Sequence, residues 1–257
     1  MLYCRFEHDD TTSYGIVEGD QVTPIDILFG EPKAAGKPHP LADVKLLAPV
    51  VPGKILAAAV NYQSHVPSGA SVLKDDGAPK VPQLFLKPTS SLVGPDDKIL
   101  LPPDARRVDA EGEVVAVIGK FCRKVSEAEA LDYVFGYSAG NDVSARHWQR
   151  DDIQWWRAKG SDSFSPLGPY IVTDLDPGNI DVRTRVNGEE TQSGNTSDLI
   201  HSIAAMISFA SQYMTLEPGD VLYTGTPGVP PKLEDGDAVE VEISGGVVLH
   251  NPVRRDD

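Results

Sequence analysis

The sequence has 257 residues and is 40% hydrophobic, which suits one large domain with a small appendage. Its net charge of −15 and isoelectric point near 4.7 argue against nucleic acid as a partner, because a phosphate backbone requires a basic face. It has no apolar run long enough to span a bilayer, no secretory signal and only two cysteines. We therefore expect a cytoplasmic protein with no membrane or nucleic-acid partner.

The first part of the chain, residues 1–49, has the pattern of a small β-rich domain followed by a linker. LYCRFEH and SYGIVEGDQVTPID are typical of short strands, the second broken by a turn at residues 18–20. Residues 31–43 are rich in Pro, Gly and Ala, which is typical of a linker. We place a domain boundary near residues 49–53 and assign residues 50–257 to a larger domain.

The larger domain is predicted to be mainly β with a few short helices. Apolar strand-like runs recur along it, among them KILAAAV, QLFLKP, EVVAVIG, VFGYSAGNDVS and VEVEI. A capping box at Ser126 and Glu129 predicts a short helix, and DLIHSIAAMISFASQYM predicts a longer one capped by a residue among 195–197. Residues 66–82 have turn residues throughout and no periodicity, which predicts a long loop that closes as a lid.

Two glutamates open the apolar strand VDAEGEVVAVIGK. Glu111 and Glu113 are two residues apart, so on an extended chain both side chains face the same way. An edge strand with one solvated face would explain them plainly. However, this strand is apolar on both faces, and a second apolar strand ends in Asp142. Three carboxylates converging on one buried site would repel one another without a cation, and all-oxygen ligation favours Mg²⁺, Mn²⁺ or Ca²⁺ over zinc.

A series of motifs follows through the larger domain: KILAAAVNYQSH, LFLKPTSSLVGP, VDAEGE, GYSAGNDVSAR, AKGSDSFSPLGP, VNGEETQSGNTSDLI, TLEPGDVLYTGTP and GDAVEVEI. In this order, over about residues 54–253, they resemble the fumarylacetoacetate hydrolase family. The resemblance implies a roll of mixed β-sheets that is usually found as a homodimer. It is specific for the family and much less so for the substrate, because one fold and site can host several reactions.

The resemblance also implies roles for individual residues. The family's E-x-E pair and downstream aspartate match Glu111, Glu113 and Asp142, the implied Mg²⁺ or Mn²⁺ ligands. The family's active-site lysine matches Lys159, which is implied to be catalytic. Substrate-binding positions of the family match Arg146, Gln149, Lys87 and Thr226.

Each of these residues also has a purely structural interpretation. Taken alone, Arg146 would be a surface ion-pair partner and Thr226 a turn residue that bonds its own backbone. Asp109 would either support the metal ligands or simply begin the strand. We interpret Asn61 and Tyr62 as structural.

His65, in NYQSH, matches a histidine that many family members pair with a nearby glutamate to activate water. The sequence has no glutamate in residues 66–82, where Asp75 and Asp76 are the only carboxylates. The dyad is therefore incomplete in its usual form, which favours reactions that need no activated water. We treat His65 as the candidate catalytic base, with a structural role as the alternative.

The resemblance implies an enzyme that acts on a small 2-oxo acid, and three functions stay open. The main prediction is a divalent-metal-dependent hydrolase that cleaves the C–C bond of a 2,4-dioxo acid, acylpyruvate or fumarylpyruvate-like, as in aromatic catabolism. The alternative is a decarboxylase or isomerase of a 2-oxo diacid of the oxaloacetate or 2-hydroxyhepta-2,4-dienedioate type. The third is a non-catalytic, metal-stabilised binding protein.

Overall fold

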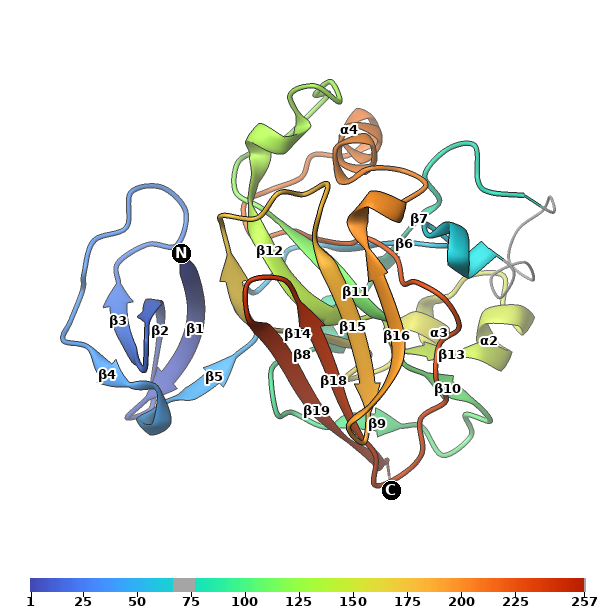
Figure 1. Ribbon diagram of the computed structural model, residues 1–257, viewed down its shortest axis with the longest axis horizontal. Coiled ribbons are helices and arrows are strands. Elements are labelled where there is room, and N and C mark those ends of the chain that lie inside the picture. The colour runs from blue at the N-terminus through green and yellow to red at the C-terminus, as the bar shows by residue number, and fades with distance from the viewer. Residues whose placement is uncertain (67–76, 257) are drawn as a thin grey trace.

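The structure is a computed structural model that describes residues 1–66 and 77–256. Figure 1 shows the N-terminal strands beside a larger β-rich body. One twelve-stranded sheet runs through both parts. Its strand order is β4 (His39–Pro40), β3 (Gln21–Ile25), β2 (Thr11–Glu18), β1 (Leu2–His8), β14 (Ser165–Val172), β12 (Val134–Asn141), β11 (Gly112–Ile118), β17 (Val221–Tyr223), β6 (Ile55–Ala58) and β7 (Leu84–Lys87), with β5 (Lys45–Leu47) paired to β1 and β8 (Leu92–Val93) paired to β14.

A five-stranded sheet packs against the larger one, and a two-stranded ladder lies beside them (Figure 1). The five strands are, in order, β16 (Glu189–Asn195), β15 (Asp181–Val186), β18 (Ala238–Ile243), β19 (Val247–Arg255) and β9 (Ile99–Leu101); the ladder joins β10 (Val108–Asp109) to β13 (Ser144–Ala145). β8, β6 and β9 pair in parallel with their neighbours β14, β17 and β19, whereas the other pairs are antiparallel. The predicted fold class, mainly β with mixed sheets and a small N-terminal β-rich part, is confirmed. The division at residues 49 and 50 stays a prediction, because β1 pairs directly with β14 and continues the sheet across it.

Strand β11 lies in the middle of the molecule and is buried along its whole length. Val114 faces a core cluster shared with Val241 of the five-stranded sheet, while Val115 and Val117 face a second cluster on the other side. The expectation of a strand covered on both faces is therefore confirmed. A strand in this position keeps the polar side chains at its start almost fully buried.

Gly112, between the two glutamates, lets β11 approach β15 closely. A Cβ atom at this position would lie 2.0 Å from Thr184 Oγ1, closer than any side chain tolerates. Because successive residues of a strand face opposite ways, Glu111 and Glu113 both turn away from Thr184. The E-G-E pattern thus fits a strand that packs tightly on one side and presents carboxylates on the other.

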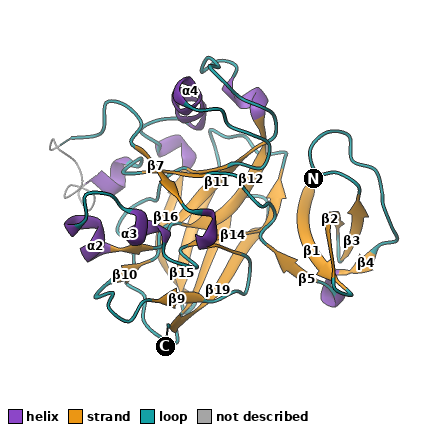
Figure 2. Cartoon of the chain, turned by 180° about the vertical axis from the view of Figure 1, so that it is seen from behind, coloured by secondary structure: helices purple, strands orange, loops and turns teal. Residues whose placement is uncertain are grey.

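The described residues form three α-helices, all short: α2 (Arg146–Asp151), α3 (Trp156–Gly160) and α4 (Ile203–Tyr213). Figure 2, seen from behind, shows α2 and α3 side by side next to β10, at the opposite end from the N-terminal strands. In the described ranges no helix is long and apolar enough to cross a membrane. Residues 67–76 of the predicted lid, with Asp75 and Asp76, lie outside the described residues.

The helix α4 starts later than the sequence suggested. Its N-cap is Ser202, whose Oγ accepts a hydrogen bond from the backbone N–H of Ala205 at 3.0 Å. The prediction of a cap among residues 195–197 is wrong for this helix, because Leu199 forms a β-bridge with Tyr62 and interrupts the helical run. Asn195 caps a separate 3-10 helix at Thr196–Asp198 instead.

The capping box at Ser126 is present, although the helix beside it is a single 3-10 turn. Both the backbone N–H and the hydroxyl of Ser126 donate to Glu129 Oε2, at 3.2 and 2.6 Å. The turn spans Ala130–Tyr133 and ends where β12 begins. The local hydrogen bonding was therefore predictable. The helix is shorter than expected because β12 begins directly after it, at Val134.

Candidate active site

The structure brings three buried carboxylates together at the start of β11. Gly112 pairs with Asn141 in the ladder of β11 and β12, so Glu111 and Asp142 lie at the same edge. The backbone N–H of Asp142 donates to the carbonyl of Glu111 at 2.9 Å, which fixes this junction. One oxygen each of Glu111, Glu113 and Asp142 lies within 4.8 Å of the others, and all three residues are buried.

Two buried lysines contact the oxygens of this cluster of three carboxylates. Lys159 Nζ donates to Glu111 Oε2 and to Asp142 Oδ2, both at 2.5 Å. Lys87 Nζ contacts the other oxygen of Asp142 and donates to the carbonyl of Phe164 at 2.6 Å. Lys87 was predicted to bind substrate, but its side chain is fully buried behind Asp142 and does not line the cavity described below. Its ammonium contacts Asp142, and a direct role in substrate binding stays a prediction.

Arg146 links the carboxylate group to the surface. Its Nη2 donates to Glu111 Oε1 at 2.5 Å, its Nε to Asp109 Oδ2 at 2.8 Å, and its Nη1 to Gln149 Oε1 at 3.0 Å. Arg146 and Gln149 are three residues apart on α2, where side chains share a face. Asp109 also accepts from Arg107 Nε at 2.7 Å, so it bridges two arginines rather than merely beginning a strand.

The pKa values of the two glutamates in the E-G-E pattern are shifted in opposite directions. Burial alone would raise the pKa of Glu111, but the positive charges of Arg146 and Lys159 outweigh burial and hold that pKa well below its usual range. Burial, followed by the negative charges of Asp142 and Glu111, raises the pKa of Glu113 well above its usual range. Among the described residues Glu113 contacts no cation, and its Oε2 accepts a hydrogen bond from the Gly225 N–H at 2.6 Å.

These carboxylates fit a divalent cation. The pKa of Glu113 is raised because its charge faces two neighbouring anions, and a cation among the three oxygens would relieve that repulsion. The donor set consists of carboxylate oxygens alone, which hard ions such as Mg²⁺ and Mn²⁺ prefer. Glu111, Glu113 and Asp142 would therefore hold such an ion.

His65 ends a short 3-10 helix at Gln63–His65 and is buried. Its Nδ1 lies 2.7 Å from the carbonyl oxygen of Gly228. Because a carbonyl only accepts, this contact requires a proton on Nδ1, so Nε2 is the nitrogen that carries the lone pair in the neutral ring. Nε2 lies 4.0 Å from Glu111 Oε1, which places it beside the carboxylate group.

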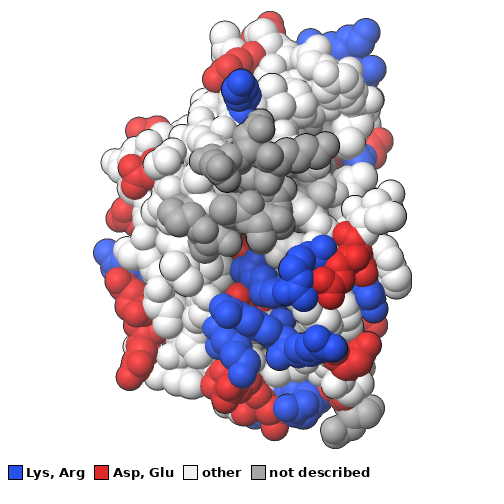
Figure 3. All heavy atoms as spheres, turned by 90° about the vertical axis from the view of Figure 1, so that its right-hand side faces the viewer, with Lys and Arg blue, Asp and Glu red and all other residues white. Residues whose placement is uncertain are grey.

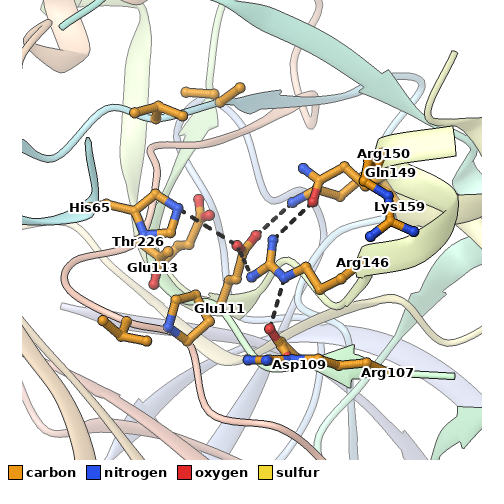
Figure 4. Close-up of a pocket in the computed structure, with 15 residues that line it drawn as sticks. His65, Arg107, Asp109, Glu111, Glu113, Arg146, Gln149, Arg150, Lys159 and Thr226 are labelled. Carbon is orange, nitrogen blue, oxygen red and sulfur yellow. Dashed lines mark hydrogen bonds and ion pairs between the residues drawn. The ribbon is translucent and has the colours of Figure 1, made fainter. Parts of the chain in front are cut away.

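A cavity of about 460 Å³ opens over these side chains (Figure 4). The predicted site residues that line it are His65, Glu111, Glu113, Arg146, Gln149, Lys159 and Thr226. Figure 4 shows contacts that join Glu111 to His65 and Arg146 inside the cavity. Three charged residues of the wall were not among the predicted site residues: Asp109, Arg107 and Arg150. The position of Arg107 in RRVDAEGE, just before the metal-ligand motif, was a signal that could have found it.

Thr226 lines the cavity, but its hydroxyl forms hydrogen bonds with other residues of the protein. Its Oγ1 donates to the carbonyl of Gly112 at 3.0 Å and accepts from Gln192 Nε2 at 2.9 Å. Gln192 Nε2 also donates to the carbonyl of Pro227 at 2.6 Å. These contacts tie the loop after β17 to β11 and β16, and the same loop supplies the Gly228 carbonyl that orients His65.

Comparison with known proteins identifies this arrangement. Residues 54–254 match the family model described as fumarylacetoacetate (FAA) hydrolase, C-terminal, and residues 1–49 match the model described as Rv2993c-like, N-terminal. The chain belongs to the fumarylacetoacetate hydrolase family. Protein Rv2993c of Mycobacterium tuberculosis is 42% identical over 266 residues, covering 99% of this chain and 98% of that protein.

Family members similar to this chain carry different activities in their names. A structure of 5-carboxymethyl-2-hydroxymuconate delta-isomerase from Mycobacterium smegmatis is 44% identical, with a TM-score of 0.92 and full coverage of both chains. The mitochondrial oxaloacetate tautomerase fahd2 of Xenopus laevis is 41% identical over 225 residues, covering 82% of this chain and 69% of that protein. The maleylpyruvate hydrolase of Sphingobium sp. SYK-6, solved with manganese (II) ion and pyruvate, is 32% identical, with a TM-score of 0.82 and full coverage of both chains. The chain is thus a family enzyme with a buried acidic triad suited to a divalent metal.

Proposed function

We propose that this family member is a divalent-metal-dependent isomerase or tautomerase of a 2-oxo diacid, of the oxaloacetate or 2-hydroxyhepta-2,4-dienedioate type. The observation that carries the proposal is the orientation of His65. With Nδ1 bonded to the Gly228 carbonyl, Nε2 is a positioned proton acceptor beside Glu111. The isomerase and tautomerase relatives support this choice over the hydrolase predicted first, and so does the sequence, which has no glutamate in residues 66–82.

Glu111, Glu113 and Asp142 would hold the metal at the inner end of the cavity. When bound there, the ion would act as a Lewis acid toward the 2-oxo acid end of the substrate. Lys159 Nζ has three N–H donors, two of which go to Glu111 and Asp142, so the third would stabilise negative charge on the keto oxygen.

His65 would move the proton that changes the isomer. Its Nε2 would take a proton from the carbon next to the keto group and return it to oxygen in a tautomerisation, or to a more distant carbon of the conjugated chain in an isomerisation. Neither reaction expels a leaving group or consumes water, so no activated water is required. The Gly228 carbonyl would stabilise the protonated imidazole, because it keeps its hydrogen bond to Nδ1 throughout.

A spectrophotometric assay tests this proposal. Metal-loaded protein is mixed with oxaloacetate enol or 2-hydroxyhepta-2,4-dienedioate, and ultraviolet absorbance follows the conversion. We expect His65→Gln to lower kcat by about 10²- to 10⁴-fold with little change in KM. His250→Gln removes an imidazole that pairs with Asp96 on the surface and serves as the control with unchanged kcat. An unchanged kcat in His65→Gln would contradict the proposed base.

Hydrolysis of a 2,4-dioxo acid is the second candidate function. It is supported by the similarity to a maleylpyruvate hydrolase along the whole chain. The same assay with a panel of acylpyruvates distinguishes the two functions, because hydrolysis releases pyruvate and isomerisation does not. Release of pyruvate faster than isomerisation would favour the hydrolase, and no turnover of any compound with Mg²⁺ or Mn²⁺ would favour the non-catalytic binding protein.

We also propose that the enzyme is a homodimer, as the family resemblance implies. Exposed apolar side chains support this, since Leu86 lies on the edge strand β7, Trp156 opens α3, and Ile153 lies between α2 and α3. Light scattering of the purified protein measures its mass directly. A mass of one chain at all concentrations would contradict the proposal.

A further inference from the structure

We infer that Arg107, Arg150 and Gln149 form a carboxylate-binding subsite at the outer end of the cavity, which selects substrates with a second carboxylate. This inference rests on the proposed function and adds the residues that recognise the far end of the substrate. All three residues line the cavity. The side chains of Arg107 and Arg150 are 52% and 64% exposed, whereas the triad at the inner end is buried.

The arginine that the family motif marks for substrate already uses three of its five N–H donors on protein oxygens. Each of the three nitrogens of Arg146 donates to a protein oxygen, in Asp109, Glu111 and Gln149. Two of those partners are carboxylates, so the charge of Arg146 is compensated before any ligand enters. Arg146 therefore helps to hold the wall in place, and its neighbours Arg107 and Arg150, which use one and two of their five N–H donors, have more donors left for an anion.

Gln149 is oriented by that contact. Because its Oε1 accepts from Arg146 Nη1 at 3.0 Å, its amide nitrogen must point away from Arg146. Within residues 1–66 and 77–256 the Nε2 of Gln149 donates to no acceptor. Gln149 lines the cavity, and this amide therefore offers it two N–H donors.

Arg107 and Arg150 keep donors available as well. Arg107 uses Nε for Asp109, and the described part of the chain offers no acceptor to its two terminal nitrogens. Arg150 pairs with its neighbour Asp151 through Nε at 2.8 Å and Nη2 at 3.4 Å, so its Nη1 has no acceptor among the described residues. An ion pair this exposed contributes little, so a substrate carboxylate can take the place of Asp151 at small cost.

Positive charge at this end is a local feature, because the whole protein carries a net charge of −15. Figure 3 shows Lys and Arg side chains gathered on the face that carries α2 and α3. A cationic mouth on an acidic protein attracts small anions locally, against the general field. Guanidinium groups also match the planar, two-oxygen shape of a carboxylate.

The two ends of the cavity together match an elongated dianion. The 2-oxo acid end of the substrate would lie at the inner end beside Glu111 and Glu113, so the opposite end of an extended diacid faces the exposed arginines. The cavity volume of about 460 Å³ lies within the usual range for small-molecule sites and leaves room for both ends. A monocarboxylic 2-oxo acid of the same length would leave the outer donors without an anion.

The experiment compares two probes that differ only in the second carboxylate and that have neither a conjugated chain to isomerise nor a C–C bond to hydrolyse, so that proton exchange leaves each compound unchanged. Isothermal titration of the Mg²⁺-loaded protein measures the affinity of 2-oxoadipate and of 2-oxohexanoate. We expect the wild type to prefer 2-oxoadipate by about 10- to 100-fold, and Arg107→Gln or Arg150→Gln to weaken 2-oxoadipate binding by about 3- to 10-fold each. Binding of 2-oxohexanoate should stay unchanged in both variants, which also shows that they fold.

Arg106→Gln is the matched control. Arg106 is exposed, its charge reaches Asp151 beside Arg150, and it does not line the cavity. This variant removes the same charge from the same surface, so we expect it to retain the preference for 2-oxoadipate. An equal loss in Arg106→Gln would mean that only the general field matters and would overturn the subsite.

Three further results would also overturn the subsite: no binding of 2-oxoadipate by the wild type, equal affinity for the two probes, or an unchanged preference in Arg107→Gln and Arg150→Gln. Failure of the proposed function looks different. If the diacid preference is measured and depends on Arg107 and Arg150, while no 2-oxo diacid is isomerised, the subsite stands and the proposed reaction fails. If a diacid is isomerised without that preference, the reaction stands and the subsite fails.

Discussion

The inner and outer ends of the cavity are built in opposite ways. At the inner end Lys159, Lys87 and Arg146 contact oxygens of Glu111 and Asp142, and all of these carboxylates are buried. At the outer end two exposed arginines keep donors that no described protein group uses. The inner end is therefore preorganised for one kind of chemistry, whereas the outer end keeps donors that can recognise the rest of the substrate.

The largest effect should come from removing a carboxylate at the inner end. Glu113→Ala takes away one of three oxygen ligands and should lower the affinity for Mg²⁺ or Mn²⁺ by at least about 100-fold, because even supporting residues of a metal site cost 10- to 100-fold. Isothermal titration with each metal measures this. Asp151→Ala, on the exposed side of α2, is the control with unchanged metal affinity, and equal affinities in wild type and Glu113→Ala would refute the triad.

Removing the brace behind the triad should cost stability. Lys87→Met leaves Asp142 and the Phe164 carbonyl without a buried ammonium, which should lower the free energy of unfolding by about 3–5 kcal/mol. Urea denaturation measures the change. Lys232→Met, which breaks an exposed pair with Glu234, should cost less than about 1 kcal/mol. A similar cost in both variants would show that the inner end is no more preorganised than the surface.

The pH dependence of the metal-free protein should reveal the repulsion at Glu113. Its pKa is raised in the folded state, so the folded protein binds more protons than the unfolded chain above about pH 4.5. The free energy of unfolding should therefore fall as the pH rises from there through the raised pKa, by up to about 1.4 kcal/mol per pH unit from this group. Glu113→Gln should remove that contribution. Denaturation series at several pH values check this, and an identical slope in wild type and variant would contradict it.

The smallest expected effect is the dependence of probe binding on salt concentration, which should differ between the two ends of the cavity. The outer arginines are half exposed, so raising the ionic strength from about 0.05 to 0.5 M should weaken 2-oxoadipate binding by roughly twofold more than 2-oxohexanoate binding. Calorimetry at two salt concentrations measures the difference. An equal response of both probes would mean that the second carboxylate is not read by exposed charges.

Much of the inner end was predictable from short-range patterns. The E-G-E spacing on an apolar strand predicts that Glu111 and Glu113 share a face, and Asp142 directly follows the strand that pairs with this one. Both inferences need only the period of a β-strand. The fold class followed similarly from recurring apolar runs and turn residues.

The remaining features depend on contacts between residues far apart in the sequence. The contact of the Lys87 ammonium with Asp142 joins residues 55 positions apart, and no local pattern indicates it. The late start of α4 depends on the bridge between Leu199 and Tyr62. Arg107 and Arg150 have no pattern of their own, because an arginine that lines a cavity and one on the surface look alike in sequence. Such placements require the three-dimensional structure.

The proposed reaction requires His65 Nε2 to move a proton at the carbon next to a keto group held at the inner end. Proton exchange tests this step most directly. Metal-loaded protein and 2-oxoadipate are mixed in D₂O, and proton NMR follows the signal of the hydrogens on the carbon next to the keto group. We expect the wild type to lose that signal only when metal is bound, His250→Gln to lose it at the same rate, and His65→Gln to lose it about 10²-fold or more slowly. Exchange at the wild-type rate in His65→Gln, or none above the protein-free rate while acylpyruvates are hydrolysed, would contradict it.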